Sequence, residues 1–105
     1  MRILFDQGTP APLRKNLRPH PVDTTAERGW STISNGELIQ RAEEEGYDVF
    51  ITTDQSIRYQ QNLSGRRIGL VVLMATSWPR TQQNIPAILL AVNHVLGGGY
   101  QEVPL

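Results

Sequence analysis

Two aspartates stand at the ends of short apolar runs, a pattern that can bring two carboxylates to one edge of a β-sheet. Residues 3–5 lead directly into Asp6, and residues 49–53 lead directly into Asp54. If the two runs are neighbouring parallel strands, both side chains emerge at the carboxyl ends of the strands, where open α/β folds place their ligand sites. We therefore expect Asp6 and Asp54 to lie close together and to form an oxygen-donor site.

A third carboxylate, Glu37, is expected near the same edge. It falls in the first turn of a helix leading into the second apolar run, and such a helix starts at the carboxyl edge of the sheet. Mg²⁺ binds oxygen ligands, usually one or two carboxylates completed by water and substrate phosphate. A cation held by Asp6, Glu37 and Asp54 could polarise a phosphodiester and activate a water molecule. These three residues are our predicted metal ligands and catalytic residues, with Mg²⁺ or Mn²⁺ as the cofactor.

Each of the three carboxylates also has a purely structural interpretation. Asp54 could be an N-cap for the residues that follow it, which contributes about 1 kcal/mol. Glu37 lies three residues after Ser34, as in a capping box, and four residues before Arg41, as in a helical ion pair. Asp6 could brace the turn that follows it. The sequence alone leaves the structural and the functional interpretations open.

Polar residues that could contact a substrate fall near the same predicted edge. The candidates are Asn35, Arg58, Thr76 and Ser77. Arg58 could bind a phosphate and the adjacent Tyr59 could stack on a base, although an ordinary solvated helix explains this pair equally well. Thr76 and Ser77 follow the apolar run 68–74, so they are expected at the rim of the same sheet edge.

The elements that must position these residues alternate between strands and helices. Strands are predicted at residues 2–5, 22–25, 48–53 and 68–74, with a last edge strand at 100–104. Helices are predicted at residues 10–17, 34–45 and 84–96, with a short helix or turn at 55–63. This alternation gives right-handed βαβ units. We therefore predict an α/β fold, a three-layer α/β/α sandwich with a mostly parallel sheet.

Apolar spacing assigns an inward face to two of these helices. In the helix 34–45 that face contains Leu38, Ile39 and Ala42, and Gly46 ends the helix. In the last helix the repeat is formed by Ile85, Ile88, Leu89, Val92 and Val95.

Length and composition narrow the possible classes of protein. The 105 residues, 1–105, are expected to form a single domain. The absence of cysteine excludes disulfides, thiolate zinc sites and cysteine nucleophiles. Ten basic and ten acidic residues give no net charge, so a bound polyanion would have to be held by a local patch. With no long apolar segment and no signal-peptide layout, we expect a cytoplasmic protein with no membrane association.

The order of these motifs resembles that of a known family. The segment Met1-Arg2-Ile3-Leu4-Phe5-Asp6 with a turn and Pro10, the helix start Ser34-Asn35-Gly36-Glu37-Leu38, and the run 48–54 ending at Asp54 are similar to small stand-alone PIN-like proteins. The resemblance covers residues 2 to about 75. It implies a PIN-like α/β/α sandwich and a Mg²⁺- or Mn²⁺-dependent ribonuclease. It also implies RNA as substrate and a cognate antitoxin as partner, because many such proteins are predicted toxins of toxin-antitoxin pairs.

The chain departs from the family pattern in its acidic residues. Asn35 and Ser56 stand where the family often has acids, and Thr76 and Ser77 replace a further acid. Fewer carboxylates attract a cation less strongly. The alternative prediction is therefore a catalytically inactive PIN-like module that binds a protein partner or a second copy of itself as a homodimer. A third possibility, a phosphate-receiving domain, also suits an open parallel sheet but lacks a second acid beside Asp6 and a suitably placed lysine.

Overall fold

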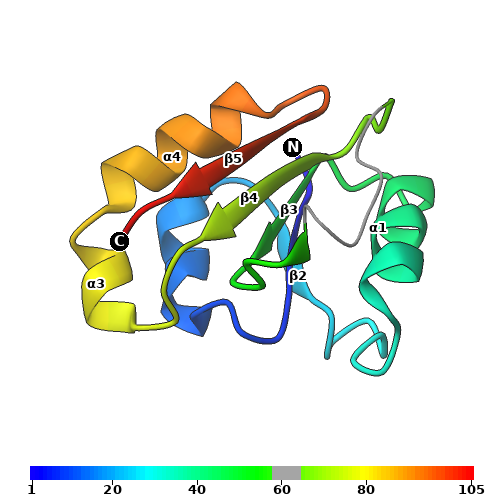
Figure 1. The fold of residues 1–105 in the computed structure, drawn as a ribbon, viewed down its shortest axis with the longest axis horizontal. Helices are drawn as coiled ribbons and strands as arrows, with labels where there is room; N and C mark the ends of the chain where they lie inside the picture. The colour runs from blue at the N-terminus through cyan, green and yellow to red at the C-terminus, as the bar shows by residue number, and fades with distance from the viewer. Residues whose placement is uncertain (58–64) are drawn as a thin grey trace.

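The computed structural model describes residues 1–57 and 65–105, and it contains one sheet of five parallel strands (Figure 1). The strands are β1 (Ile3–Phe5), β2 (Val22–Thr24), β3 (Val49–Thr52), β4 (Gly69–Leu73) and β5 (Gly99–Val103). Their order across the sheet is β2-β1-β3-β4-β5, and every neighbouring pair is parallel. The predicted α/β class is confirmed, and the sheet is wholly rather than mostly parallel.

Helices cover both faces of the sheet and complete three layers. On one face lie η1 (Ala11–Leu17), α3 (Trp78–Gln82) and α4 (Ile85–His94), and on the other lies α1 (Asn35–Glu44). Successive strand residues point to opposite faces. Phe5 and Ile51 therefore pack in the core on the η1 and α4 side, while Leu4 and Phe50 pack in the core beneath α1. The arrangement is the predicted α/β/α sandwich and is consistent with a PIN-like fold.

Helix α1 follows its predicted pattern closely. Leu38, Ile39 and Ala42 are buried against the sheet, and the chain turns out of the helix at Gly46 with a φ of 84°. Such a positive φ favours glycine because other residues have a Cβ that crowds the backbone there. Ser34 is the N-cap residue, but its side chain makes no capping hydrogen bond, so the predicted capping box with Glu37 is not formed.

The last helix, α4, differs from its prediction at one position. Ile88, Val92 and Val95 are buried as expected, whereas Leu89 is 36% exposed and Ala91 is buried in its place. Successive helical residues are rotated by about 100°. Leu89 therefore lies on the flank of the stripe that Ile88 and Val92 define.

Two short helices depart from the expected pattern. The predicted helix at 10–17 is a 3₁₀ helix, and the prolines at its start cannot donate backbone hydrogen bonds. Helix α3 was not predicted because its five residues are too few to show an apolar period. Ser77 caps α3 by accepting a hydrogen bond from the backbone N–H of Arg80.

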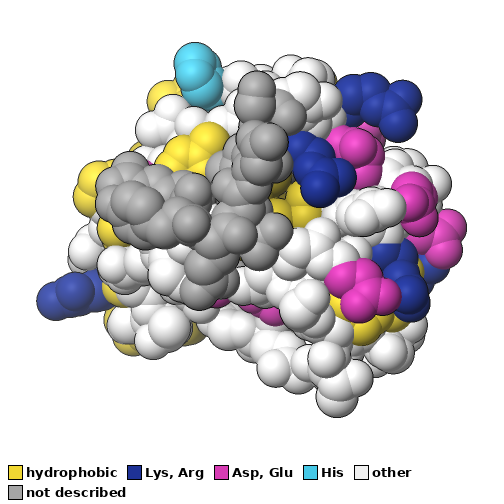
Figure 2. Space-filling model, turned by 45° about the vertical axis from the view of Figure 1, so that its right-hand side comes forward, with side chains coloured by type: hydrophobic (Ala, Val, Ile, Leu, Met, Phe, Trp, Pro, Cys, Tyr) yellow, Lys and Arg dark blue, Asp and Glu magenta, His cyan; other side chains and the backbone are white. Residues whose placement is uncertain are grey.

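Charged side chains of both signs are interspersed on the side of the molecule that α1 covers (Figure 2). On α1 itself, Glu37 and Arg41 form an ion pair one turn apart, with an N–O distance of 3.2 Å. The visible surface of the described residues is thus electrically mixed, in keeping with the zero net charge of the chain.

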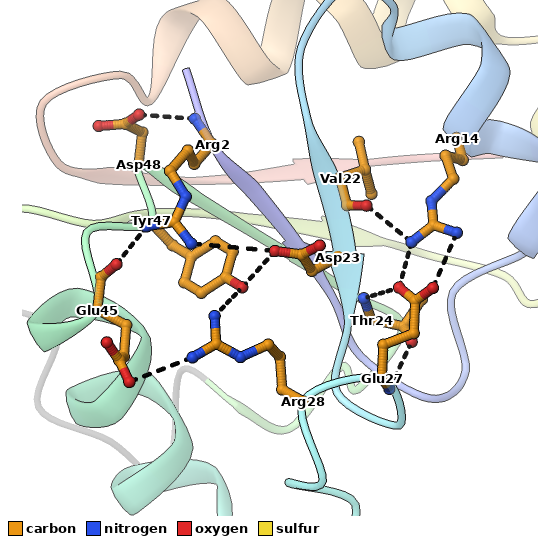
Figure 3. Close-up of polar contacts among 10 residues, drawn as sticks. All are labelled: Arg2, Arg14, Val22, Asp23, Thr24, Glu27, Arg28, Glu45, Tyr47 and Asp48. Atoms are coloured by element: carbon orange, nitrogen blue, oxygen red, sulfur yellow. Dashed lines mark hydrogen bonds and ion pairs between the residues drawn. The ribbon is translucent and has the colours of Figure 1, made fainter.

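The β2 edge of the sheet is closed by an ion pair between Arg14 of η1 and Glu27 (Figure 3). Arg14 Nη2 donates a hydrogen bond of 2.7 Å to the carbonyl oxygen of Val22. Glu27 Oε1 accepts a hydrogen bond of 2.9 Å from the backbone N–H of Thr24. These two backbone groups point away from β1, so the ion pair occupies positions that a further strand would need.

One predicted element lies mostly outside the residues that the structure describes. Most of the segment predicted as a helix or turn at 55–63, including Arg58 and Tyr59, falls outside the described residues. Among residues 1–57 and 65–105, no helix has the length and apolar character needed to cross a membrane.

Candidate metal and catalytic site

The strand order changes direction at β1 and β3, and the carboxyl ends of these two strands lie side by side. From β1 the chain passes through η1 to β2 on one side, and from β2 it returns through α1 to β3 on the other side of β1. Because η1 and α1 cover opposite faces, the direction of winding reverses between β1 and β3. Open α/β sheets bind ligands at such a reversal. Asp6 and Asp54 follow the two strands that flank it.

The register of β1 and β3 places Asp6 beside Thr52. Phe5 pairs with Ile51, and the backbone N–H of Asp6 donates to the carbonyl oxygen of Ile51 at 2.9 Å, so the ladder continues one residue past β1. Side chains alternate along a strand. Asp6 and Thr52 therefore point to the face that α1 covers, as Leu4 and Phe50 do.

A buried hydroxyl joins the two aspartates. Thr52 Oγ1 donates a hydrogen bond of 2.8 Å to Asp6 Oδ2 and accepts one of 3.0 Å from the backbone N–H of Asp54. Thr52 has no exposed surface, so water does not compete for this hydroxyl. The Asp6 carboxylate and the backbone of Asp54 are thus joined by a continuous hydrogen-bonded path through one side chain.

The carboxylate of Asp54 is held by donors on both of its oxygens. Oδ1 accepts hydrogen bonds from the backbone N–H and the hydroxyl of Ser56, at 3.0 and 2.7 Å. Oδ2 accepts one from Asn35 Nδ2, at the start of α1, at 2.5 Å. The bond from the Ser56 hydroxyl lowers the pKa of Asp54, burial opposes this, and the bonds from Ser56 N–H and Asn35 lower it further. Asp54 is therefore held in its charged form, as a metal ligand must be.

The loop after β1 holds Asp6 at the carboxyl end of that strand. Asp6 Oδ1 accepts a hydrogen bond of 2.9 Å from the backbone N–H of Gln7. Thr9 Oγ1 donates 2.9 Å to the carbonyl oxygen of Ile51 and is buried. Gly8 lies so close to the side chain of Thr53 that a Cβ at this position would overlap the Thr53 hydroxyl. The loop is thus packed directly on the end of β3.

Glu37 lies apart from the two aspartates. Two residues along a helix amount to a rotation of about 200°, so when Asn35 faces Asp54, Glu37 points to the other side of α1. There it is exposed and pairs with Arg41, as its structural interpretation predicted. In the described part of the chain, no three His, Cys, Asp or Glu side chains are grouped closely enough to hold a metal ion. The structure therefore links Asp6 to the Asp54 backbone through Thr52, and Glu37 takes no part in this hydrogen-bonded path.

The four residues predicted to contact substrate lie in different surroundings. Asn35 binds Asp54 directly, and Ser77 serves as the cap of α3. Thr76 is exposed in the loop between β4 and α3, and Arg58 lies outside the described residues. The ends of β3 and β4 are tied together by Gln55 Nε2, which donates 3.1 Å to the carbonyl oxygen of Met74.

The remaining lone pairs show how a divalent cation would fit. An ionised carboxylate offers roughly four lone-pair positions. At Asp54 three of these positions accept hydrogen bonds, two from Ser56 and one from Asn35. At Asp6 two positions accept hydrogen bonds, one from Thr52 and one from Gln7. About three positions remain between the two residues. That is enough for a cation that takes one or two carboxylates and keeps several waters, and it is too few for a rigid all-protein cage.

A second polar cluster, around Tyr47, was not anticipated from the sequence (Figure 3). The Tyr47 hydroxyl donates 2.6 Å to Asp23 Oδ2 and accepts 2.8 Å from Arg28 Nη1. Burial raises the pKa of Tyr47, as does its hydrogen bond to Asp23. Arg28 also lies over the ring of Trp30, 4.5 Å from its centroid, and Trp30 is only 6% exposed. These contacts attach β2 and the loop after it to the end of α1, so the cluster has a structural role.

A groove of about 390 Å³ lies away from the aspartates, between α4 and β5. Its lining is mostly apolar and includes Leu90, Val103 and Pro104, with His94 among the polar contributors. Leu90 is 71% exposed. The groove has no carboxylate pair of the kind found at the ends of β1 and β3.

Comparison of the chain with protein-family models, with curated proteins and with solved structures finds no match.

Proposed function

We propose that the chain is a Mg²⁺- or Mn²⁺-dependent ribonuclease of the PIN-like type. The observation that carries the proposal is the link that the buried Thr52 hydroxyl makes between the Asp6 carboxylate and the backbone N–H of Asp54, at the winding reversal of an all-parallel sheet. RNA is the proposed substrate because the motif order around these residues resembles PIN-like proteins.

In this proposal Asp6 and Asp54 hold the cation. When bound, a divalent cation polarises the scissile phosphodiester and lowers the pKa of a coordinated water, which is hydrolytic chemistry without a cysteine, serine or histidine nucleophile. Thr52 fixes the orientation of the Asp6 carboxylate, and Ser56 fixes that of Asp54. Glu37 pairs with Arg41 on the other side of α1, so the proposal assigns the ligand roles to Asp6 and Asp54 and no role at the cation to Glu37.

The test compares RNA cleavage by the wild type with cleavage by Asp6→Asn and Asp54→Asn in millimolar Mn²⁺. Both variants are expected to lose cleavage, because a neutral amide holds a hard cation poorly. Asp48→Asn is the matched control, because Asp48 precedes β3 and accepts from the backbone N–H of Arg2 at the opposite end of the strand. Full cleavage by both site variants would exclude the assignment.

Biologically, we propose a toxin restrained by a cognate antitoxin protein. This role predicts that expression of the wild type arrests growth, and that Asp54→Asn relieves the arrest. A small DNA-binding protein encoded beside the chain would be the candidate antitoxin.

A second candidate function is a non-catalytic module that binds a protein partner or a second copy of the chain. It is favoured by the internal hydrogen bonds that occupy much of Asp54 and by the exposed Leu90 and Leu96, at 71% and 50%. Under this function Mn²⁺ leaves the melting temperature unchanged, since only a ligand that binds the folded state stabilises it. If the chain instead binds Mn²⁺ with a Kd of about 1 mM, 10 mM Mn²⁺ contributes about 1.4 kcal/mol. That corresponds to a rise in Tm of roughly 5 °C.

A further inference from the structure

Asn35 occupies an unusual place for a residue expected to contact substrate. Its amide Nδ2 lies 2.5 Å from Asp54 Oδ2, whereas the other Asp54 oxygen is already engaged by Ser56. An ionised carboxylate can only accept hydrogen bonds, so the amide must present its N–H₂ group to Asp54. The Asn35 amide thereby takes a lone pair that would otherwise be available to a cation.

The position of Asn35 makes this contact part of the fold. Asn35 is the first residue of α1, and Leu38 and Ile39, three and four residues further, are buried beneath the same helix face. Packing of that face keeps the amide turned toward the end of β3. The contact therefore persists unless the first turn of α1 or the Asn35 side chain moves.

We infer that the Asn35 amide competes with the divalent cation for Asp54 and so sets the metal concentration at which the site fills. The inference rests on the proposed function, because it assumes that Asp54 is a metal ligand. Without Asn35, Asp54 has two free lone-pair positions instead of one, by the count of roughly four per carboxylate. A hydrogen bond to a charged group is worth at least about tenfold in an equilibrium constant.

The experiment measures Mn²⁺ binding directly, by calorimetry and by the Mn²⁺-induced shift in Tm. Asn35→Ala is expected to bind Mn²⁺ about tenfold more tightly than the wild type. Its Tm without metal should be lower, because the bond to Asp54 is lost, and its Mn²⁺-induced shift should be larger. Asn35→Asp should show the same two effects more strongly, since it places a second negative charge beside Asp54. Asn93→Ala, an exposed change on α4, is the matched control and should leave both quantities unchanged.

The possible results separate the inference from the proposed function. Weaker Mn²⁺ binding by Asn35→Ala would make Asn35 a ligand and overturn the inference while supporting the metal site. Equal binding by the wild type and both Asn35 variants would make the contact merely structural, and would also overturn the inference with the metal site intact. If none of the proteins binds Mn²⁺, the inference falls together with the proposed function.

Discussion

Thr52→Val tests whether the buried hydroxyl between the two aspartates organises the site. Valine keeps the shape and the β-branch of threonine but can neither donate to Asp6 nor accept from the N–H of Asp54. A hydrogen bond to a charged group contributes about 1.5–3 kcal/mol and a neutral one about 1 kcal/mol. Because Asp6 is half-exposed, water replaces part of the first bond. The expected loss is therefore about 2–3 kcal/mol.

Urea unfolding measures this loss directly. With a slope of about 1.5 kcal/mol per molar urea, the midpoint should fall by roughly 1.5–2 M. Thr52→Ser is the matched control, because it keeps the hydroxyl and removes one methyl group, at a cost of about 1 kcal/mol. If Thr52→Val is as stable as Thr52→Ser, the hydroxyl does not hold the two aspartates together and the account of the site is wrong.

Three further changes test other parts of the structure. Replacing both Arg14 and Glu27 by alanine uncovers the outward backbone groups of β2. The double variant should therefore associate in a concentration-dependent way that light scattering detects. A strictly monomeric double variant would show that the edge is protected in another way. Desolvation raises the pKa of Glu43, but hydrogen bonds from two backbone N–H groups before β4, together with the charges of Arg66 and Arg67, more than offset this, and the pKa is lowered. The contribution of Glu43 to stability is therefore present above pH 4.5 and lost as the pH falls below it. Glu43→Gln should flatten the decline in urea midpoint between pH 4.5 and 3, and an unchanged slope would contradict the assignment. Gly8→Ala should lower the Tm by several degrees, because the added Cβ overlaps the Thr53 hydroxyl, so that either the Thr53 side chain or the loop carrying Asp6 must shift. An unchanged Tm would mean that one of them yields freely.

The class of fold followed from local features of the chain. Apolar runs of strand length alternating with amphipathic segments are enough to specify an α/β sandwich, because each strand must be covered on both faces. Leu38, Ile39 and Ala42 were identified as buried from their spacing alone, and the end of α1 from Gly46. The local pattern could not reveal α3, because its five residues are too few to show apolar positions at i, i+3, i+4 and i+7.

The composition of the site could be predicted only in part. Asp6 and Asp54 were identified because each closes an apolar run, and parallel strands end at one edge. Thr52 was missed, although it is the last residue of β3 and precedes Asp54 by two residues. Its role depends on the register with β1, which sets Asp6 beside it, and register is a property of the assembled sheet.

The sequence by itself determined which oxygen donors stand at strand ends, since that depends only on residue order and apolar pattern. The tertiary structure decided which of them meet. Thr52 links the Asp6 carboxylate to the backbone of Asp54, the Asn35 amide binds the Asp54 carboxylate, and Glu37 pairs with Arg41. The physical reason is rotational: the side that a helical residue faces is fixed by how α1 packs on the sheet, and residues two positions apart face nearly opposite ways.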